Sequence, residues 1–149
     1  MIAALQGKTL ATAESCTGGG IGAALTAVPG SSKVYRGGII SYTNDVKIRQ
    51  LGVSAEILER SGAVSAEVAQ AMATGAREKL GADIAISVTG LAGPGGDEYG
   101  NPVGTVYIGY ADDQCCVSER FLFEGDRESI RNQAVVAALK LLTDHLSKK

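Results

Sequence analysis

Hydrophobic and polar positions follow two recurring patterns along the chain. Short apolar runs bounded by glycine and polar residues predict β-strands at residues 8–14, 38–43 and 82–88. Apolar residues that recur three and four positions apart predict amphipathic helices that begin after Ser65 and after Asp126. Because these strands and helices follow one another in the sequence, the pattern indicates an α/β protein.

Residues that favour helix ends define the shorter helices. A helix is predicted over residues 17–28, directly after the first strand. Asn44 is a suitable N-cap for a further helix over residues 45–51, and Gly52 is suited to end it. These borders place Lys47 in the first turn of its helix.

The C-terminal half contains a predicted β-hairpin. Its strands cover residues 105–110 and 115–123, and the polar residues 112–114 form the turn between them. A hairpin added to alternating strands and helices predicts a three-layer α/β/α sandwich with a mixed, mostly parallel sheet. No internal repeat or linker interrupts the pattern, so we expect a single domain over residues 1–149.

The composition narrows the possible functions. The net charge of the 149 residues is −2 and only 5% are aromatic, so we expect no binding to nucleic acid. No apolar run reaches the roughly 18 residues that span a bilayer. The N-terminus also lacks the features of a signal peptide. We therefore expect no membrane association and a cytoplasmic location.

Cysteine and histidine are too sparse for a metal site. The three cysteines are Cys16, Cys115 and Cys116, and the one histidine, His145, is near the C-terminus. Cys16 lies at a predicted helix start, where a thiol can be activated, but no histidine is nearby in sequence to serve as its base. A small buried apolar role is the preferred interpretation of Cys16. We expect neither a metal nor a cofactor.

Lys47 has the most unusual expected environment. A cation in the first turn of a helix faces the positive end of the helix dipole, and burial would lower the lysine pKa further. A neutral lysine can act as a general base, and Ser32 and Tyr42 are nearby in sequence as a candidate nucleophile and relay. This set predicts an amidase-type or esterase-type hydrolase. The alternative is an ordinary lysine that extends to solvent.

Two glycine-rich segments are candidate ligand loops. Residues 13–20 join a strand to a helix, and free N–H groups at a helix start can bind a phosphate or carboxylate. Residues 90–104 form a long loop after a buried strand, which is typical of a ligand wall. Tight strand-to-helix packing and a flexible surface loop are the respective structural alternatives.

Two arginines of the last predicted helix could also bind an anion. Arg127 and Arg131 are four residues apart, so they lie on one helix face and can both reach a phosphate. Surface ion pairing with Glu124 and Glu128 is the alternative.

Several of these motifs occur in the same order as in a known family. They are Ala13-Glu14-Ser15-Cys16-Thr17-Gly18-Gly19, Gly30-Ser31-Ser32, Ser41-Tyr42-Thr43-Asn44 with Lys47, Val88-Thr89-Gly90-Leu91-Ala92-Gly93-Pro94 and Pro102-Val103-Gly104-Thr105-Val106. From about Thr9 to Leu142 the chain closely resembles the C-terminal domain of the competence/damage-inducible protein CinA. That family includes stand-alone nicotinamide-nucleotide amidohydrolases.

The resemblance implies an activity and a set of roles. The expected reaction hydrolyses the carboxamide of nicotinamide mononucleotide to nicotinate mononucleotide and ammonia, through a metal-independent serine mechanism in a homodimer. Ser32 would be the nucleophile, and Tyr42 and Lys47 would activate it. The candidate substrate-binding residues are Glu14, Ser15, Thr17, Gly18, Gly19, Thr89, Gly90, Gly93, Arg127 and Arg131.

The chain departs from the family pattern at its N-terminus. The family domain usually has an extra helical segment before its first strand, whereas only residues 1–7 precede that strand here. The molybdopterin-binding-like domain of full CinA is also lacking, so the chain resembles the stand-alone form. Two rival functions are a non-catalytic pyridine-nucleotide-binding module and a cysteine hydrolase that uses Cys16.

Overall fold

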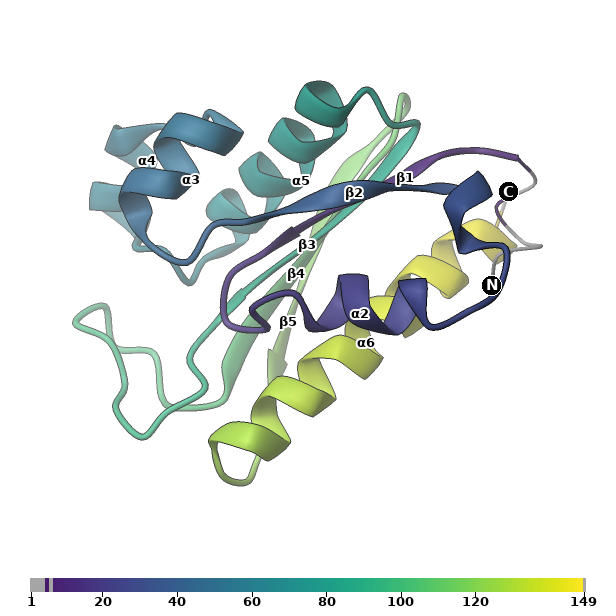
Figure 1. The fold of residues 1–149 in the computed structure, drawn as a ribbon. Coiled ribbons are helices and arrows are strands. Elements are labelled where there is room, and N and C mark those ends of the chain that lie inside the picture. Colours follow the sequence, from purple (N-terminus) through teal and green to yellow (C-terminus); the bar gives the residue numbers. More distant parts are fainter. Residues whose placement is uncertain (1–4, 6, 149) are drawn as a thin grey trace.

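A computed structural model describes residue 5 and residues 7–148, and these form one five-stranded sheet between two layers of helices. Across the sheet the strands are β2 (Tyr35–Ile40), β1 (Leu10–Glu14), β3 (Ile84–Gly90), β4 (Thr105–Ala111) and β5 (Cys116–Leu122). Helices α2 (Gly20–Thr26) and α6 (Arg127–Ser147) cover one face, and α3 (Asn44–Leu51), α4 (Ala55–Ser61) and α5 (Ala66–Leu80) cover the other (Figure 1). The predicted three-layer α/β/α sandwich is confirmed.

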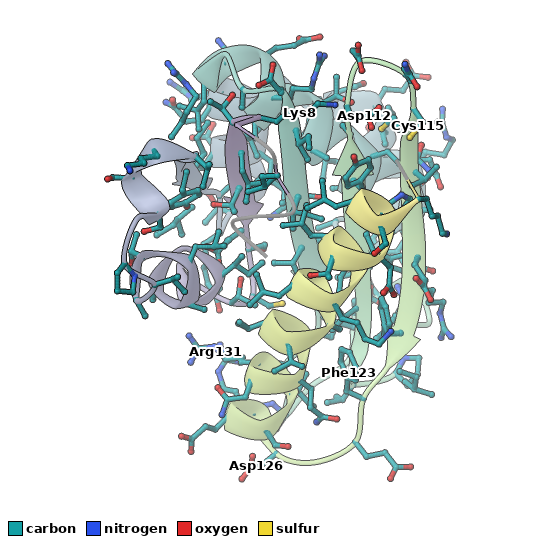
Figure 2. All side chains as sticks on the ribbon, turned by 90° about the vertical axis from the view of Figure 1, so that its right-hand side faces the viewer. Lys8, Asp112, Cys115, Phe123, Asp126 and Arg131 are labelled. Carbon is teal, nitrogen blue, oxygen red and sulfur yellow. The ribbon has the colours of Figure 1, made fainter. Side chains whose placement is uncertain are left out.

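The sheet is mixed, and its strand directions bring several loops to one edge. β1 pairs with β2 and β3 in parallel, whereas the β3–β4 and β4–β5 pairings are antiparallel. The carboxyl ends of β1, β2 and β3 therefore meet at the same edge. Figure 2 shows Asp126, just before α6, at the end of the molecule opposite the hairpin turn marked by Asp112 and Cys115. The first turn of α6 therefore lies at the same edge of the sheet as the carboxyl ends of β1, β2 and β3.

Small residues let α5 lie close to its face of the sheet. Ala11 and Ala85 pack on that side, and a Cβ atom added to Gly109 would come within 2.4 Å of the Ala69 carbonyl oxygen. Larger residues occupy the alternate positions and pack towards α2 and α6, as the two-residue period of a strand requires. They include Leu10, Ile84, Ile86, Val88 and Ile108.

Several predicted boundaries are wrong by one to three residues; α2, for example, covers Gly20–Thr26 rather than residues 17–28, and β2 begins at Tyr35 rather than at residue 38. β2 ends at Ile40, before the predicted end at residue 43, because the Ser41 N–H donates to the Glu14 carbonyl at 2.7 Å and the chain then turns. The N-cap of α3 is Thr43 rather than Asn44, since its Oγ1 accepts the Val46 N–H at 3.4 Å. α3 begins one residue earlier than predicted, and Lys47 lies at its fourth position.

The N-terminal departure from the family pattern falls mostly outside the described residues, although Leu5 is buried in the core beside α2 and α6. Among the described helices, none offers a stretch of the length and apolarity that a bilayer crossing demands.

Candidate active site

A pocket of about 310 Å³ lies at the edge where β1, β2 and β3 end. Residues just beyond each strand line it, together with the start of the loop after β3 and the first turn of α6. They include Ser15, Cys16, Tyr42, Lys47, Thr89, Gly93 and Arg127. In open α/β sheets the carboxyl ends of strands are the usual place for ligands.

A larger groove of about 510 Å³ runs along α5, but it contains no buried titratable side chain among the described residues that line it. Its titratable side chains, Glu67, Glu78, Lys79 and Cys116, are all exposed. Pocket size alone therefore does not identify the reactive site, and the smaller pocket with a buried lysine is the stronger candidate.

Lys47 is buried at the base of the smaller pocket, with only 1% of its surface exposed. Its Nζ donates to Ser15 Oγ at 3.0 Å, to the Ser41 carbonyl at 2.8 Å and to the Tyr42 carbonyl at 3.4 Å. None of the ion pairs among the described residues includes Lys47. The amine is therefore surrounded by neutral oxygen atoms and lacks a carboxylate to stabilise its charge.

Burial lowers the pKa of Lys47 from its ordinary value of 10.5 to about 8. The predicted direction is confirmed. The neutral form also fits the local geometry, because an uncharged amine has two N–H bonds and one lone pair. The Ser41 and Tyr42 carbonyls can accept the two N–H bonds, and the lone pair is then left for the Ser15 hydroxyl proton.

Ser15 follows β1 directly, and its backbone N–H donates to the Val88 carbonyl of β3 at 3.1 Å. This bond holds the residue between the ends of two strands. The family resemblance predicts Ser15 as a substrate-binding residue. Ser15 does line the pocket, and its hydroxyl lies next to the amine of Lys47, an arrangement that a serine nucleophile and its general base would need.

The structure does not bring Ser32 to Lys47. Ser32 is exposed in the short 3-10 helix η1 (Ser31–Lys33), before β2, whereas Lys47 lies in α3, beyond the other end of that strand (Figure 1). Six extended residues of β2 separate the two ends by about 20 Å. The expected contact between the Ser32 hydroxyl and Lys47 is therefore wrong, because the intervening residues form a strand that carries the chain across the sheet.

Tyr42 and Arg127 form a pair at the mouth of the pocket. Arg127 Nη2 donates to the Tyr42 hydroxyl at 3.0 Å, and Nη1 donates to the Gly93 carbonyl at 2.6 Å. The Tyr42 side chain is 60% exposed, and Lys47 contacts its backbone carbonyl rather than its hydroxyl. The Tyr42 hydroxyl thus has Arg127 rather than Lys47 as its hydrogen-bond partner, and its role as a proton relay stays a prediction.

Arg131 has a different role from Arg127. Its Nε donates to the Cys16 carbonyl at 3.0 Å and its Nη2 to the Thr17 carbonyl at 3.3 Å. Figure 2 shows the side chain extending from α6 away from the Phe123 side of the helix. Arg131 supports the turn after Ser15, and Arg127 is the arginine that lines the pocket.

The start of α2 is occupied by the protein's own carboxylate. Glu14 is only 2% exposed, and its Oε1 accepts the Thr17 hydroxyl at 2.6 Å and the Ile21 N–H at 2.9 Å. Its Oε2 accepts the Gly22 N–H at 3.0 Å. The anion site predicted at this helix start is therefore filled internally, because Glu14 neutralises the free N–H groups that a phosphate would use.

Three further residues that are predicted to bind substrate lie beside this carboxylate or in the turn that follows it. Thr17 is buried against Glu14, and Gly18 and Gly19 form the turn that leads into α2. None of the three residues lines the pocket. Gly18 and Gly19 have φ angles of 60° and 105°, a left-handed conformation that favours glycine at both positions.

Replacing Glu14 with glutamine is expected to reduce the free energy of unfolding by about 2 kcal/mol, because an amide loses the charge and one acceptor that satisfy buried donors. Urea unfolding would measure the change. Glu119→Gln is the matched control, since Glu119 is exposed on β5 and its change is expected to stay within about 0.5 kcal/mol. Unchanged stability in the Glu14 variant, with weaker substrate binding, would restore the substrate-binding interpretation.

The end of β3 and the loop that follows it both line the pocket. Thr89 Oγ1 donates to the Ala63 carbonyl at 2.8 Å, and Gly90 continues the strand beside β4. Gly93 has a φ angle of 92°, and a Cβ atom there would come within 2.8 Å of the Val103 side chain. All three predicted residues line the pocket, and Gly93 is required by backbone conformation and packing.

The structure gives little support to a cysteine nucleophile, a histidine base or a metal ion at this site. Burial raises the pKa of the Cys16 thiol to about 11, so the thiol is protonated at neutral pH. His145 stacks on Tyr110 with ring centroids 4.2 Å apart, near the far end of α6. No group of three metal-ligating side chains is found in the described part of the chain.

Known proteins support the family assignment. The family model described as the CinA C-terminal domain matches residues 2–146. The chain belongs to the CinA C-terminal domain family. A CinA-like protein of Citrifermentans bemidjiense is 52% identical over 141 residues, which cover 95% of this chain and 34% of that relative. This chain thus spans about a third of the length of such CinA-like relatives.

Shorter members of the CinA family match most of their own length. A protein of Pseudomonas putida named nicotinamide-nucleotide amidohydrolase PncC is 51% identical over 128 residues, covering 86% of this chain and 80% of the relative. The crystal structure of a CinA superfamily protein from Klebsiella pneumoniae 700603 superposes with a TM-score of 0.96 at 39% identity. That match covers 99% of this chain and 94% of the other.

Proposed function

We propose that this protein hydrolyses the carboxamide of nicotinamide mononucleotide, with Ser15 as nucleophile and Lys47 as general base. The observation that carries the proposal is the 3.0 Å contact between Lys47 Nζ and Ser15 Oγ at the base of a pocket. The reaction class is supported by the 51% identity to a relative named nicotinamide-nucleotide amidohydrolase. We further propose a cytoplasmic location and no resident cofactor and, as the family resemblance implies, a homodimer.

The proposed first half-reaction forms an acyl-enzyme. Lys47 Nζ takes the proton of the Ser15 hydroxyl, and Ser15 Oγ attacks the carboxamide carbon. Cys16 follows the nucleophile and lines the same pocket, so its backbone N–H is our candidate donor to the developing oxyanion. The Lys47 ammonium returns the proton to the leaving nitrogen. The C–N bond breaks, and ammonia departs.

The second half-reaction regenerates the enzyme. Neutral Lys47 removes a proton from water, and the resulting hydroxide attacks the ester carbonyl on Ser15. The bond between the acyl carbon and Ser15 Oγ breaks, and Lys47 returns the proton to the serine oxygen. Nicotinate mononucleotide leaves as the product. Arg127 is proposed to bind the substrate phosphate at the pocket mouth, where its guanidinium already bridges Tyr42 and Gly93.

Incubating the purified protein with nicotinamide mononucleotide tests the function. We expect one ammonia and one nicotinate mononucleotide per substrate consumed, identified by product mass. kcat/KM should rise with pH and level off above about 8, because only the deprotonated amine of Lys47 can accept the serine proton. Binding of the mononucleotide without ammonia release would instead support the non-catalytic module. A flat profile between pH 6 and 9 would argue against the neutral lysine.

A further inference from the structure

The backbone carbonyls of three consecutive residues beside the pocket each accept a hydrogen bond from a different side chain. The Gly62 carbonyl accepts the Ser65 hydroxyl at 2.9 Å, and the Ala63 carbonyl accepts the Thr89 hydroxyl at 2.8 Å. The Val64 carbonyl accepts Asn101 Nδ2 at 3.2 Å. Ala63 and Val64 both line the pocket, so these bonds define the position of its wall.

Only one of these three donors belongs to the glycine-rich loop. Ser65 precedes α5, which follows the wall directly, and Thr89 lies in β3. Asn101 comes from the loop over residues 91–104, whose first residues, Leu91 and Gly93 among them, line the same pocket. The Asn101 side chain therefore ties two pocket-lining segments to each other.

The side chain of Asn101 is itself held in place. Asp97 Oδ2 accepts Asn101 Nδ2 at 2.8 Å, and Asp97 Oδ1 accepts the backbone N–H groups of Tyr99 and Asn101 at 3.1 and 2.9 Å. The Tyr99 hydroxyl donates to the Glu59 carbonyl of α4 at 2.8 Å. The Tyr99 ring leaves no space for a side chain at Gly62, where an added Cβ atom would lie 2.7 Å from it.

We propose that Asn101 is a positioning residue for substrate binding, an inference that rests on the proposed function. Through the Val64 carbonyl it fixes the spacing between the 63–64 wall and the 91–95 segment of the loop. The lining contributed by Ala63, Val64, Leu91 and Ala92 is apolar and suits a flat pyridine ring. Asn101 does not line the pocket and does not contact Ser15 or Lys47, so its loss leaves the chemical step intact.

The kinetic test is Asn101→Ala. We expect KM for nicotinamide mononucleotide to rise about fivefold to tenfold, the size of one lost hydrogen bond in a binding equilibrium. kcat and the pH at which activity levels off should stay unchanged. Asn101→Gln, which keeps an amide donor, should give an intermediate KM. Asn132→Ala is the matched control, because Asn132 is exposed on α6 and should leave KM unchanged.

A purely structural role for Asn101 gives a different result. Loss of folded protein lowers kcat per total enzyme and leaves KM unchanged, and that outcome would overturn the proposal. Calorimetric binding to Ser15→Ala, with and without Asn101→Ala, provides a second test that needs no turnover. A Kd that rises about fivefold to tenfold when Asn101→Ala is added to Ser15→Ala supports the positioning role, and an unchanged Kd overturns it. Failure of the wild-type protein to release ammonia contradicts the proposed function separately.

Discussion

Replacing Ser15 with alanine is expected to lower kcat for ammonia release from nicotinamide mononucleotide by about 10³-fold or more. The substitution removes the oxygen atom that Lys47 Nζ contacts at 3.0 Å. Folding should be little affected, because the backbone N–H of residue 15 keeps its bond to the Val88 carbonyl. Substrate affinity should also be retained, so calorimetry should detect binding without turnover.

Two nearby variants are the controls for Ser15. Ser32→Ala should have wild-type activity, because Ser32 is exposed at the opposite end of β2. Cys16→Ala should keep most of its activity, since the buried Cys16 thiol is protonated at neutral pH. An inactive Ser32 variant beside an active Ser15 variant would reverse our assignment, and an inactive Cys16 variant beside an active Ser15 variant would identify a cysteine hydrolase.

Replacing Lys47 with methionine is expected to lower kcat by about 10³-fold or more, because the uncharged side chain fills a similar space but cannot accept a proton. The residual rate should no longer depend on pH near 8. Lys79→Met is the matched control, since Lys79 is exposed on α5. Substantial activity in the Lys47 variant, with a wild-type pH profile, would assign the base to another group.

The same variant should change how stability depends on pH. The pKa of Lys47 falls from 10.5 to about 8 on folding, so below pH 8 the amine is charged in both states and its burial cost is fully present. As pH rises from 8 to 10.5 the folded protein loses this proton first. The wild-type free energy of unfolding should therefore rise by about 3 kcal/mol relative to Lys47→Met between pH 7 and 10.5. Parallel curves for the two proteins would contradict the lowered pKa.

Most of the fold follows from local sequence signals. Helix α5 begins after the predicted N-cap, where Ser65 Oγ accepts the Val68 N–H at 3.3 Å, and α6 begins after Asp126 in the same way. Gly52 ends α3 in a left-handed conformation, as predicted. These features were predictable because capping bonds and helical spacing depend on residues a few positions apart.

The nucleophile was harder to predict because it depends on strand order. Ser32 and Lys47 are 15 positions apart in sequence, yet β2 separates them, whereas Ser15 and Lys47 meet across neighbouring strands. One signal could have identified Ser15. It directly follows a buried strand, and Lys47 follows the next strand, so parallel pairing would place both at one edge of the sheet.

The role of Glu14 could not be read from the sequence. A glycine-rich helix start suits a phosphate, but the sequence does not reveal that a carboxylate seven positions before Ile21 folds back onto its N–H. Local sequence patterns also do not predict the hydrogen bond from Asn101 to the Val64 carbonyl, because the two residues are 37 positions apart. Both contacts are set by tertiary packing.

The most direct test of the central claim is an NMR titration of the lysine side chains, with Lys47 assigned by its absence from the Lys47→Met spectrum. We predict one resonance that titrates near pH 8, well below the ordinary lysine pKa of 10.5. That result would establish a buried amine that is neutral at mildly alkaline pH beside the Ser15 hydroxyl. A Lys47 resonance that titrates near 10.5 would contradict the account.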